Sequence, residues 1–238
     1  MEKAKKIKLY IGLFYLLFIG LFIYYFFSKF SFQEITSYDF IKNNRDYFFE
    51  LKQSNIFLLS AIFFLFTIVW VLAAGFGSPI ALFGGFIFGK WVGSIIVVLS
   101  LAVGASLLYL FANFFLKELI KEKFLKKYQN LEIKFKKSEF IFLLIYRFIG
   151  GIPFAISNVL PCIFNVKVSN FFWATLLGIL PQIFLICSIG SGLEKVIEKN
   201  LETPKFIDLI ITQDIYLPLI VFAGLIIITI FLRKKFYK

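Results

Sequence analysis

Two long apolar stretches, residues 56–116 and 140–193, constrain this chain more than any other feature. The first contains a single charged residue, Lys90, and the second contains only Arg147 and Lys167. Each stretch is more than twice the ~20 residues that one membrane-spanning helix needs. The whole chain is 60% hydrophobic and 17% charged, too few polar residues to cover a soluble domain of 238 residues. We therefore predict an all-α integral membrane protein that crosses the bilayer several times.

Three segments carry a clear net positive charge, and their positions predict the topology. Segments 1–9, 116–139 and 233–238 carry net charges of +3, +4 and +4, whereas 31–55 and 191–215 carry −1 and −2. The positive-inside rule places the three basic segments, and hence both termini, in the cytoplasm. Most of the net charge of +12 thus sets orientation, which argues against a nucleic-acid partner. The compact chain and short tails are typical of a bacterial inner-membrane protein.

This topology divides the chain into segments. A first transmembrane helix within 1–30, without a following cleavage motif, and a closing helix with a basic tail at 215–238 flank the core, and 31–55 and 193–214 are predicted as external loops. Each long stretch must cross an odd number of times although it has length for about two passes. The solution is a re-entrant hairpin followed by a full span. The resulting core segments are hairpin 56–90, span 92–116, basic amphipathic cytoplasmic segment 117–139, hairpin 140–167 and span 169–190.

An internal repeat supports two related units. The run GSPIAL from Gly77 matches GIPFAI from Gly151 at an offset of 74 residues, and Gly104 matches Gly178 at the same offset. Because the two units enter the membrane from opposite sides, we predict an inverted repeat. Broken helices at membrane depth must be buried in protein or line a watery cavity, and inverted repeats of this kind place a transporter's substrate site at their interface.

Arg147 is the first candidate for contact with a substrate. A charged side chain inside the membrane costs about 2.5–3.5 kcal/mol, and neither long stretch contains an acid that could neutralise it. A cation without a partner invites an anionic ligand, and the arginine fork suits bidentate binding of phosphate. In the alternative interpretation, Arg147 lies about two turns from Glu139 and snorkels back to the cytoplasmic headgroups.

Further candidate substrate-binding residues lie around the predicted breaks. They are Gly77, Pro79, Gly151, Pro153 and Asn158. The prolines most simply make the turns, and they also leave backbone groups free to bind a polar ligand, while Asn158 either caps a broken helix or touches substrate. Lys90 and Lys167 end the hairpins, as interfacial anchors or as contacts to a phosphate headgroup. Pro181 is expected to kink the second span, with the Gln182 amide satisfying the carbonyls released there.

The chain lacks the residues of an enzyme site. It has no histidine, and both Cys162 and Cys187 lie in apolar runs without a CxxC neighbour, as buried small side chains do. No carboxylate pair lies at membrane depth. We therefore expect no metal, no cofactor and no catalytic residue.

The run RFIGGIPFAISN from Arg147 to Asn158, followed by LLGILP from Leu176, resembles the VTT-domain branch of the DedA superfamily, the SNARE-associated Golgi proteins. GSPIAL with the following GGFIFG is similar to the family's first hairpin. The resemblance covers residues 56–192 and implies two opposed re-entrant hairpins in a protein linked to lipid scrambling or to transport of polyprenyl phosphates. It also implies that Arg147 corresponds to the family's arginine ahead of the second hairpin.

One departure from the resemblance concerns proton coupling. DedA proteins proper carry acidic residues around the first hairpin, whereas this hairpin has Ser78 and no acid. A passive scramblase, or a lipid phosphate that meets Arg147 alone, fits this difference. If coupling exists, its carboxylate must come from the external loop, where the chain offers Glu34, Asp39, Asp46 and Glu50.

The leading hypothesis is a transporter or scramblase that moves a phosphate-bearing lipid through a groove between the hairpins. Its partners are then membrane lipids with anionic phosphate headgroups, and a homo-oligomer is compatible with the pattern. Two alternatives remain open. One is a small-solute or ion-coupled secondary transporter, and the other is a membrane scaffold whose segment 117–139 recruits partners or anionic lipid.

Overall fold

The computed structural model of the chain describes residues 2–29, 38–115 and 138–198, with a few isolated helical positions between 216 and 227. Within these residues every regular element is a helix and none is a strand. Three of the predicted segments lie mostly outside the described residues: 117–139, 193–214 and 215–238. The all-α prediction is confirmed for the described part of the chain.

Nine helical elements make up the described residues. They are α1 (Glu2–Lys29), α3 (Tyr38–Ser54), α4 (Ile56–Leu72), α5 (Gly77–Phe88), α6 (Lys90–Phe115), α8 (Glu139–Ile149), α9 (Phe154–Val159), the 3₁₀ helix η1 (Leu160–Phe164) and α10 (Val168–Glu198). Four stretches among them are long and apolar enough to span a membrane: Tyr10–Lys29, Lys42–Leu72, Lys90–Phe115 and Val168–Lys195. Together with the composition, these spans make the chain an integral membrane protein.

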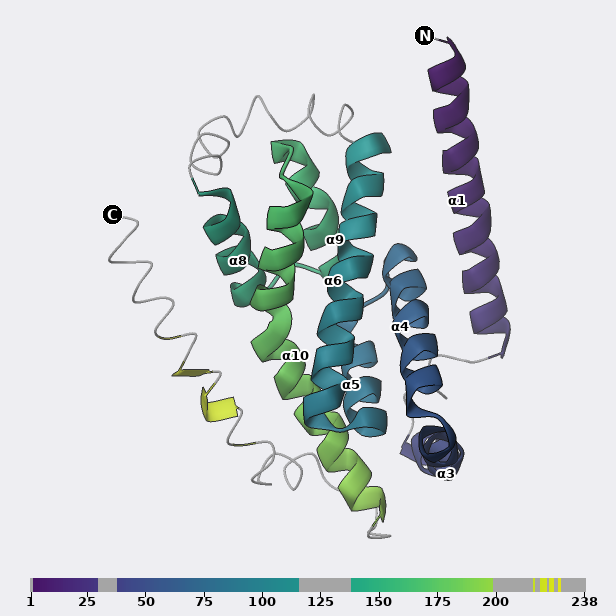
Figure 1. Cartoon of the computed structure of the whole chain (residues 1–238), viewed down its shortest axis with the longest axis vertical. Coiled ribbons are helices and arrows are strands. Elements are labelled where there is room, and N and C mark those ends of the chain that lie inside the picture. Colours follow the sequence, from purple (N-terminus) through teal and green to yellow (C-terminus); the bar gives the residue numbers. More distant parts are fainter. Residues whose placement is uncertain are drawn as a thin grey trace.

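The two long helices α6 and α10 pack against each other at the centre of the molecule (Figure 1). α4 and α5 surround one half of this pair, and α8, α9 and η1 surround the other half. The short helices pack crosswise, because α5 lies against α10 whereas α9 and η1 lie against α6. The buried core follows this arrangement, with one apolar cluster centred on Leu101 and Ile183 and a second centred on Tyr109 and Phe171.

The first break, residues 73–76, separates α4 from α5. Ala74 has a φ of 60°, and Gly75 lies so close to Trp70 that an added Cβ would be 2.2 Å from the indole nitrogen. The same nitrogen donates to the carbonyl of Phe76 at 2.9 Å and so fixes the turn. Pro79 then lies in the first turn of α5, where its missing N–H costs nothing.

The second break, residues 150–153, separates α8 from α9. Gly150 and Gly151 have φ values of 68° and 84°, in the left-handed region where side chains with a Cβ are strained. Pro153 then forms the N-cap of α9 with a φ of −50°. Glycine and proline therefore form the second break, as predicted. At the first break the prediction is wrong in detail, because Gly77 and Pro79 lie within α5 and the turn is made before them, at Ala74 and Gly75.

Two helices extend into segments that we predicted as external loops. The structure places α3 within 31–55, and α10 continues past the predicted end of the span at residue 190 to Glu198. In Figure 1, α3 is seen end-on, so it crosses α4 at a steep angle. Its Phe48 and Phe49 pack on an apolar cluster at the ends of α5 and α10. The loop prediction missed α3 because its apolar residues are interspersed with charged ones.

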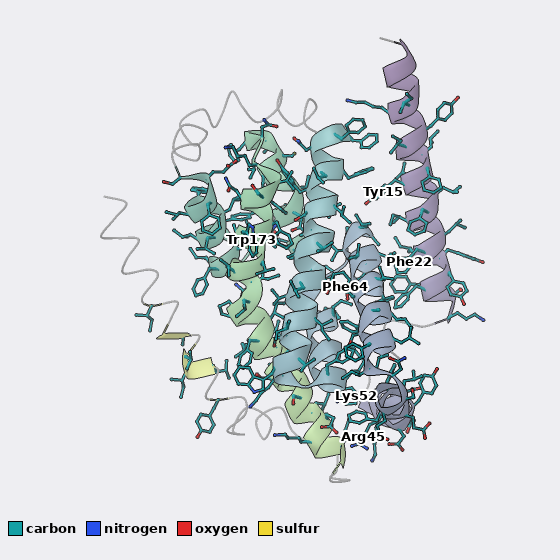
Figure 2. All side chains as sticks on the ribbon, viewed as in Figure 1. Tyr15, Phe22, Arg45, Lys52, Phe64 and Trp173 are labelled. Atoms are coloured by element: carbon teal, nitrogen blue, oxygen red, sulfur yellow. The ribbon has the colours of Figure 1, made fainter. Side chains whose placement is uncertain are left out.

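α3 and α1 are attached to the core by contacts between distant parts of the sequence. Arg45 of α3 pairs with Glu194 of α10 at 2.9 Å. Tyr15 and Phe22 of α1 point toward the core (Figure 2). Tyr15 donates to the carbonyl of Leu72, the last residue of α4, and its ring stacks on Phe111 with centroids 3.9 Å apart. The N-terminal helix is thus packed beside the first break.

Glu139 joins the start of α8 to the start of α10. Its carboxylate accepts from the backbone N–H of Lys167 at 2.9 Å and from the Asn170 side chain. The two carboxylate oxygens thus accept hydrogen bonds at the N-terminus of α10, as the side chain of a capping residue does. We expect Glu139→Ala to lower the free energy of unfolding by about 1–2 kcal/mol, measured as thermal stability in detergent. Glu50→Ala, which removes an exposed acid from α3, is the control and should change stability little.

Candidate functional site

A cavity of about 250 Å³ lies where the two breaks meet. Phe76 of the first break lines it together with Gly77 and Ser78, which begin α5, and residues 150–153 line it from the second break. Its remaining walls come from α6, α8, α9 and α10: Leu101, Tyr146, Arg147, Phe154, Ser157, Ile179, Gln182, Ile183 and Ile186. Leu101 and Ile183 are near the middles of the two long helices. The cavity is therefore at half height in the molecule.

Arg147 is the charged residue of this cavity. It lies in the last turn of α8, and its side chain is buried, with the residue 4% exposed. Nε donates to Oγ1 of Thr175 at 3.1 Å. Nη1 donates to Oγ of Ser157 at 2.6 Å, and Nη2 donates to Oδ1 of Asn158 at 2.7 Å. All three acceptors are neutral, so they satisfy the hydrogen bonds of the guanidinium without cancelling its charge.

Aromatic rings surround the same guanidinium. Its central carbon lies 5.0 Å from the ring centroid of Phe171, 5.7 Å from that of Phe154 and 5.9 Å from that of Tyr146. Rings at this range attract a cation through their quadrupoles, and they also exclude water. No carboxylate pairs with Arg147 among the residues that the structure describes. The cavity therefore has a positive wall, and the side chain does not reach back to the surface as the snorkelling interpretation requires.

The side chain of Gln182 in α10 caps the C-terminal end of α8. Its Nε2 donates to the carbonyl oxygens of Phe148 at 2.7 Å and of Arg147 at 3.2 Å. The close contact depends on Gly178, one turn earlier, where an added Cβ would lie 2.5 Å from Cβ of Arg147. We expected Gln182 to serve carbonyls released by Pro181 in its own helix. The structure instead assigns it to the carbonyls of α8.

The predicted substrate-binding residues divide into two groups. Arg147, Gly77, Gly151 and Pro153 line the cavity, and Asn158 lies behind it as an acceptor for Arg147. Pro79 follows the lining residue Ser78 but is not itself part of the wall.

The two lysines predicted to contact headgroups lie away from the cavity. Lys90 begins α6, and Lys167 is exposed immediately before α10. Neither lines the cavity, so the structure does not bring them together with Arg147. Their contact with headgroups stays a prediction.

Sequence reasoning did not single out Ser157, Thr175 or Tyr146. Ser157 and Thr175 are acceptors for Arg147, and Tyr146 adds a buried hydroxyl that has no hydrogen-bond partner among the residues that the structure describes. Ser157 and Thr175 lie 10 and 28 residues after Arg147, so no helical spacing connects them with it. The available signal was only that they are polar residues inside an apolar stretch.

Comparison with known proteins identifies the family of one part of the chain. Residues 76–192 match the family model of the VTT domain, so the match begins at the first break and leaves α4 outside, whereas the resemblance in the sequence extended to residue 56. No solved structure matches the chain.

Two relatives share part of the sequence. The "Transmembrane protein 41 homolog" of Caenorhabditis elegans is 26% identical over 136 residues, which are 54% of this chain and 55% of that protein. The uncharacterised protein YqeD of Bacillus subtilis (strain 168) is 30% identical over 116 residues, which are 48% of this chain and 55% of that protein. The chain thus spans just over half the length of each relative. These matches confirm the family resemblance: residues 76–192 of the chain carry a VTT domain.

Proposed function

We propose that the chain moves a phosphate-bearing lipid across the bilayer as a scramblase or transporter, without breaking a covalent bond. The observation that carries the proposal is the Arg147 guanidinium, buried and uncompensated beside a cavity where two helix breaks meet. A positive group inside the membrane attracts an anionic headgroup, and the apolar walls of the cavity suit the start of the acyl chains. In this proposal a phosphate joins or replaces the neutral acceptors Ser157 and Asn158.

The proposal includes two re-entrant hairpins. The first consists of α4 and α5, and the second consists of α8, α9 and η1. At 1.5 Å per residue, the 26 residues of α6 reach about 39 Å, whereas the 12 residues of α5 reach only about 18 Å. A hydrocarbon core of about 30 Å is therefore too thick for α5 to cross. α4 and α5 then enter and leave on the same side, and the first break lies at depth.

An inverted repeat of these units is also part of the proposal. Gly104 of α6 and Gly178 of α10 are 74 residues apart, and each touches the end of the helix that comes before the break in its own unit, α4 for Gly104 and α8 for Gly178. An added Cβ would lie 2.9 Å from Val71 at the first and 2.5 Å from Arg147 at the second. The crosswise packing of the short helices supports the same relation.

The proposed orientation follows the charge of the loops. Both termini lie in the cytoplasm, and the membrane is the inner, cytoplasmic membrane of a bacterium. The basic segments support this orientation, and the relative in Bacillus subtilis supports the source. Lys90 and Lys167 then lie near opposite membrane surfaces and interact there with headgroups.

The test is a translocation assay with purified protein in liposomes of defined lipids. A fluorescent phospholipid is present in both leaflets, and a membrane-impermeant reductant destroys the fluorescence that it can reach. We expect nearly complete loss of fluorescence with protein and loss of only the outer leaflet's share without it. If no lipid crosses while vesicles take up inorganic phosphate, the small-solute alternative replaces the lipid proposal.

A further inference from the structure

The end of α8 presents two opposite charges to the cavity. The last carbonyl groups of a helix have no partner within the helix, and together they carry about half a negative charge. Arg147 lies in the same turn and carries a full positive charge. If another group covers the carbonyls, an anionic ligand that enters the cavity meets only the positive charge of Arg147. If the carbonyls are uncovered, it meets a positive and a negative charge side by side.

We infer that Gln182 is the positioning residue that makes this cavity select an anion, because its amide covers the α8 carbonyls and leaves Arg147 as the charge that a ligand meets. The amide nitrogen binds two of those carbonyls, at 2.7 and 3.2 Å. It also lies over the second break, 3.2 Å from the Cβ position of Gly150. Gln182 is itself a wall of the cavity.

An amide suits this position better than the side chains of similar size. A carboxylate at residue 182 cannot donate, so it would leave both carbonyls uncovered and add a negative charge. A leucine fills the same space without donating a hydrogen bond. The inference rests on the proposed function for the identity of the ligand. The effect of Gln182 on the local electrostatic potential, however, can be measured without any lipid movement.

The experiment reads the potential at the second break through a reporter thiol. Ile152 lines the cavity and is 40% exposed, whereas the native Cys162 and Cys187 are both 0% exposed, so Ile152→Cys provides the reactive site. The labelling rates of an anionic and a cationic methanethiosulfonate reagent of similar size are measured at pH 8. Their ratio reports the sign and strength of the local charge, and a merely structural defect would change both rates in the same sense.

We expect Gln182→Leu in this background to lower the anionic-to-cationic ratio about two- to fivefold, the effect of one uncovered helix end. Gln182→Glu should lower it about tenfold or more, since a full charge is added. Gln53→Glu, the same chemical change at an exposed position of α3, should leave the ratio unchanged.

Three outcomes would overturn the inference. They are a ratio in both Gln182 variants equal to that of Gln53→Glu, an equal fall of both rates, and a reporter that reacts with neither reagent, because an anion-selecting cavity must be reachable from water. In the liposome assay, Gln182→Leu should slow an anionic phospholipid more than a zwitterionic one. If the wild type moves neither lipid, the proposed function fails while the labelling ratio still decides the role of Gln182.

Discussion

Replacing Arg147 by methionine is expected to abolish lipid translocation while the protein stays folded. The substitution removes the positive charge of the cavity and the fork that would hold a phosphate. Hydrogen bonds to charged groups contribute about 1.5–3 kcal/mol each, so the loss of two of them corresponds to a fall of roughly 100-fold or more in rate. The measurement is the liposome assay with equal amounts of reconstituted protein.

The fold should survive because two effects of this substitution oppose each other. The three hydrogen bonds that Arg147 donates to Thr175, Ser157 and Asn158 are lost. Removing a buried charge recovers a cost of about 2.5–3.5 kcal/mol, and methionine fills a space of similar length with apolar atoms. We therefore expect the thermal midpoint to change by only about 5 °C or less.

Two further variants complete the test of Arg147. Arg45→Met makes the same change at the α3–α10 ion pair, outside the cavity, and should retain translocation. Arg147→Lys keeps the charge but cannot form the planar fork, so an intermediate rate is expected. Translocation at the wild-type rate by Arg147→Met would show that the guanidinium does not bind the lipid.

Replacing Gly190 by alanine is expected to prevent assembly of the core. An added Cβ at this position would lie 2.1 Å from the backbone carbonyl oxygen of Leu82, and one at Gly85 on the facing helix would lie 2.1 Å from that of Cys187. These neighbours are backbone atoms of helices, which cannot rotate away as a side chain can. Separation of α5 from α10 would cost about 3 kcal/mol or more. Fluorescence-detected size exclusion should show loss of the monodisperse peak.

Gly20→Ala in α1 is the matched control, because nothing lies within 4 Å of the Cβ position there. Alanine favours a helix more than glycine does, so this variant should be as stable as the wild type or slightly more stable. A monodisperse Gly190→Ala protein with a wild-type melting temperature would contradict the close packing of α5 on α10.

The sequence predicts the second break well because its causes are local. Gly150 and Gly151 adopt backbone angles that favour glycine, and Pro153 starts a helix, whatever the rest of the chain does. The all-helical membrane fold follows with similar directness from the apolar stretches. The VTT resemblance, carried by the residues around the second break, is confirmed.

The partners of Arg147 could not be predicted, because they depend on how separate helices pack. Its position in an apolar stretch marks it as unusual, but the identity of its acceptors depends on how α8, α9 and α10 come together. The same holds for Gln182, which the sequence connects with its neighbour Pro181 and the structure connects with α8. The sequence analysis missed α3 for another reason. The apolar residues of this helix alternate with charged ones, so it has no long apolar run that would mark it.

The crosswise seating of the short helices limits how this protein can change shape. A cut between residues 115 and 138 divides the described core into two halves, yet α5 of the first half is held by α10 of the second, and α9 of the second by α6 of the first. Rolling one half over the other as a rigid body would pull apart the backbone contacts of Gly85 and Gly190. An opening of the cavity that keeps these contacts must therefore come from bending at the two breaks, where Ala74, Gly150 and Gly151 have left-handed backbone angles.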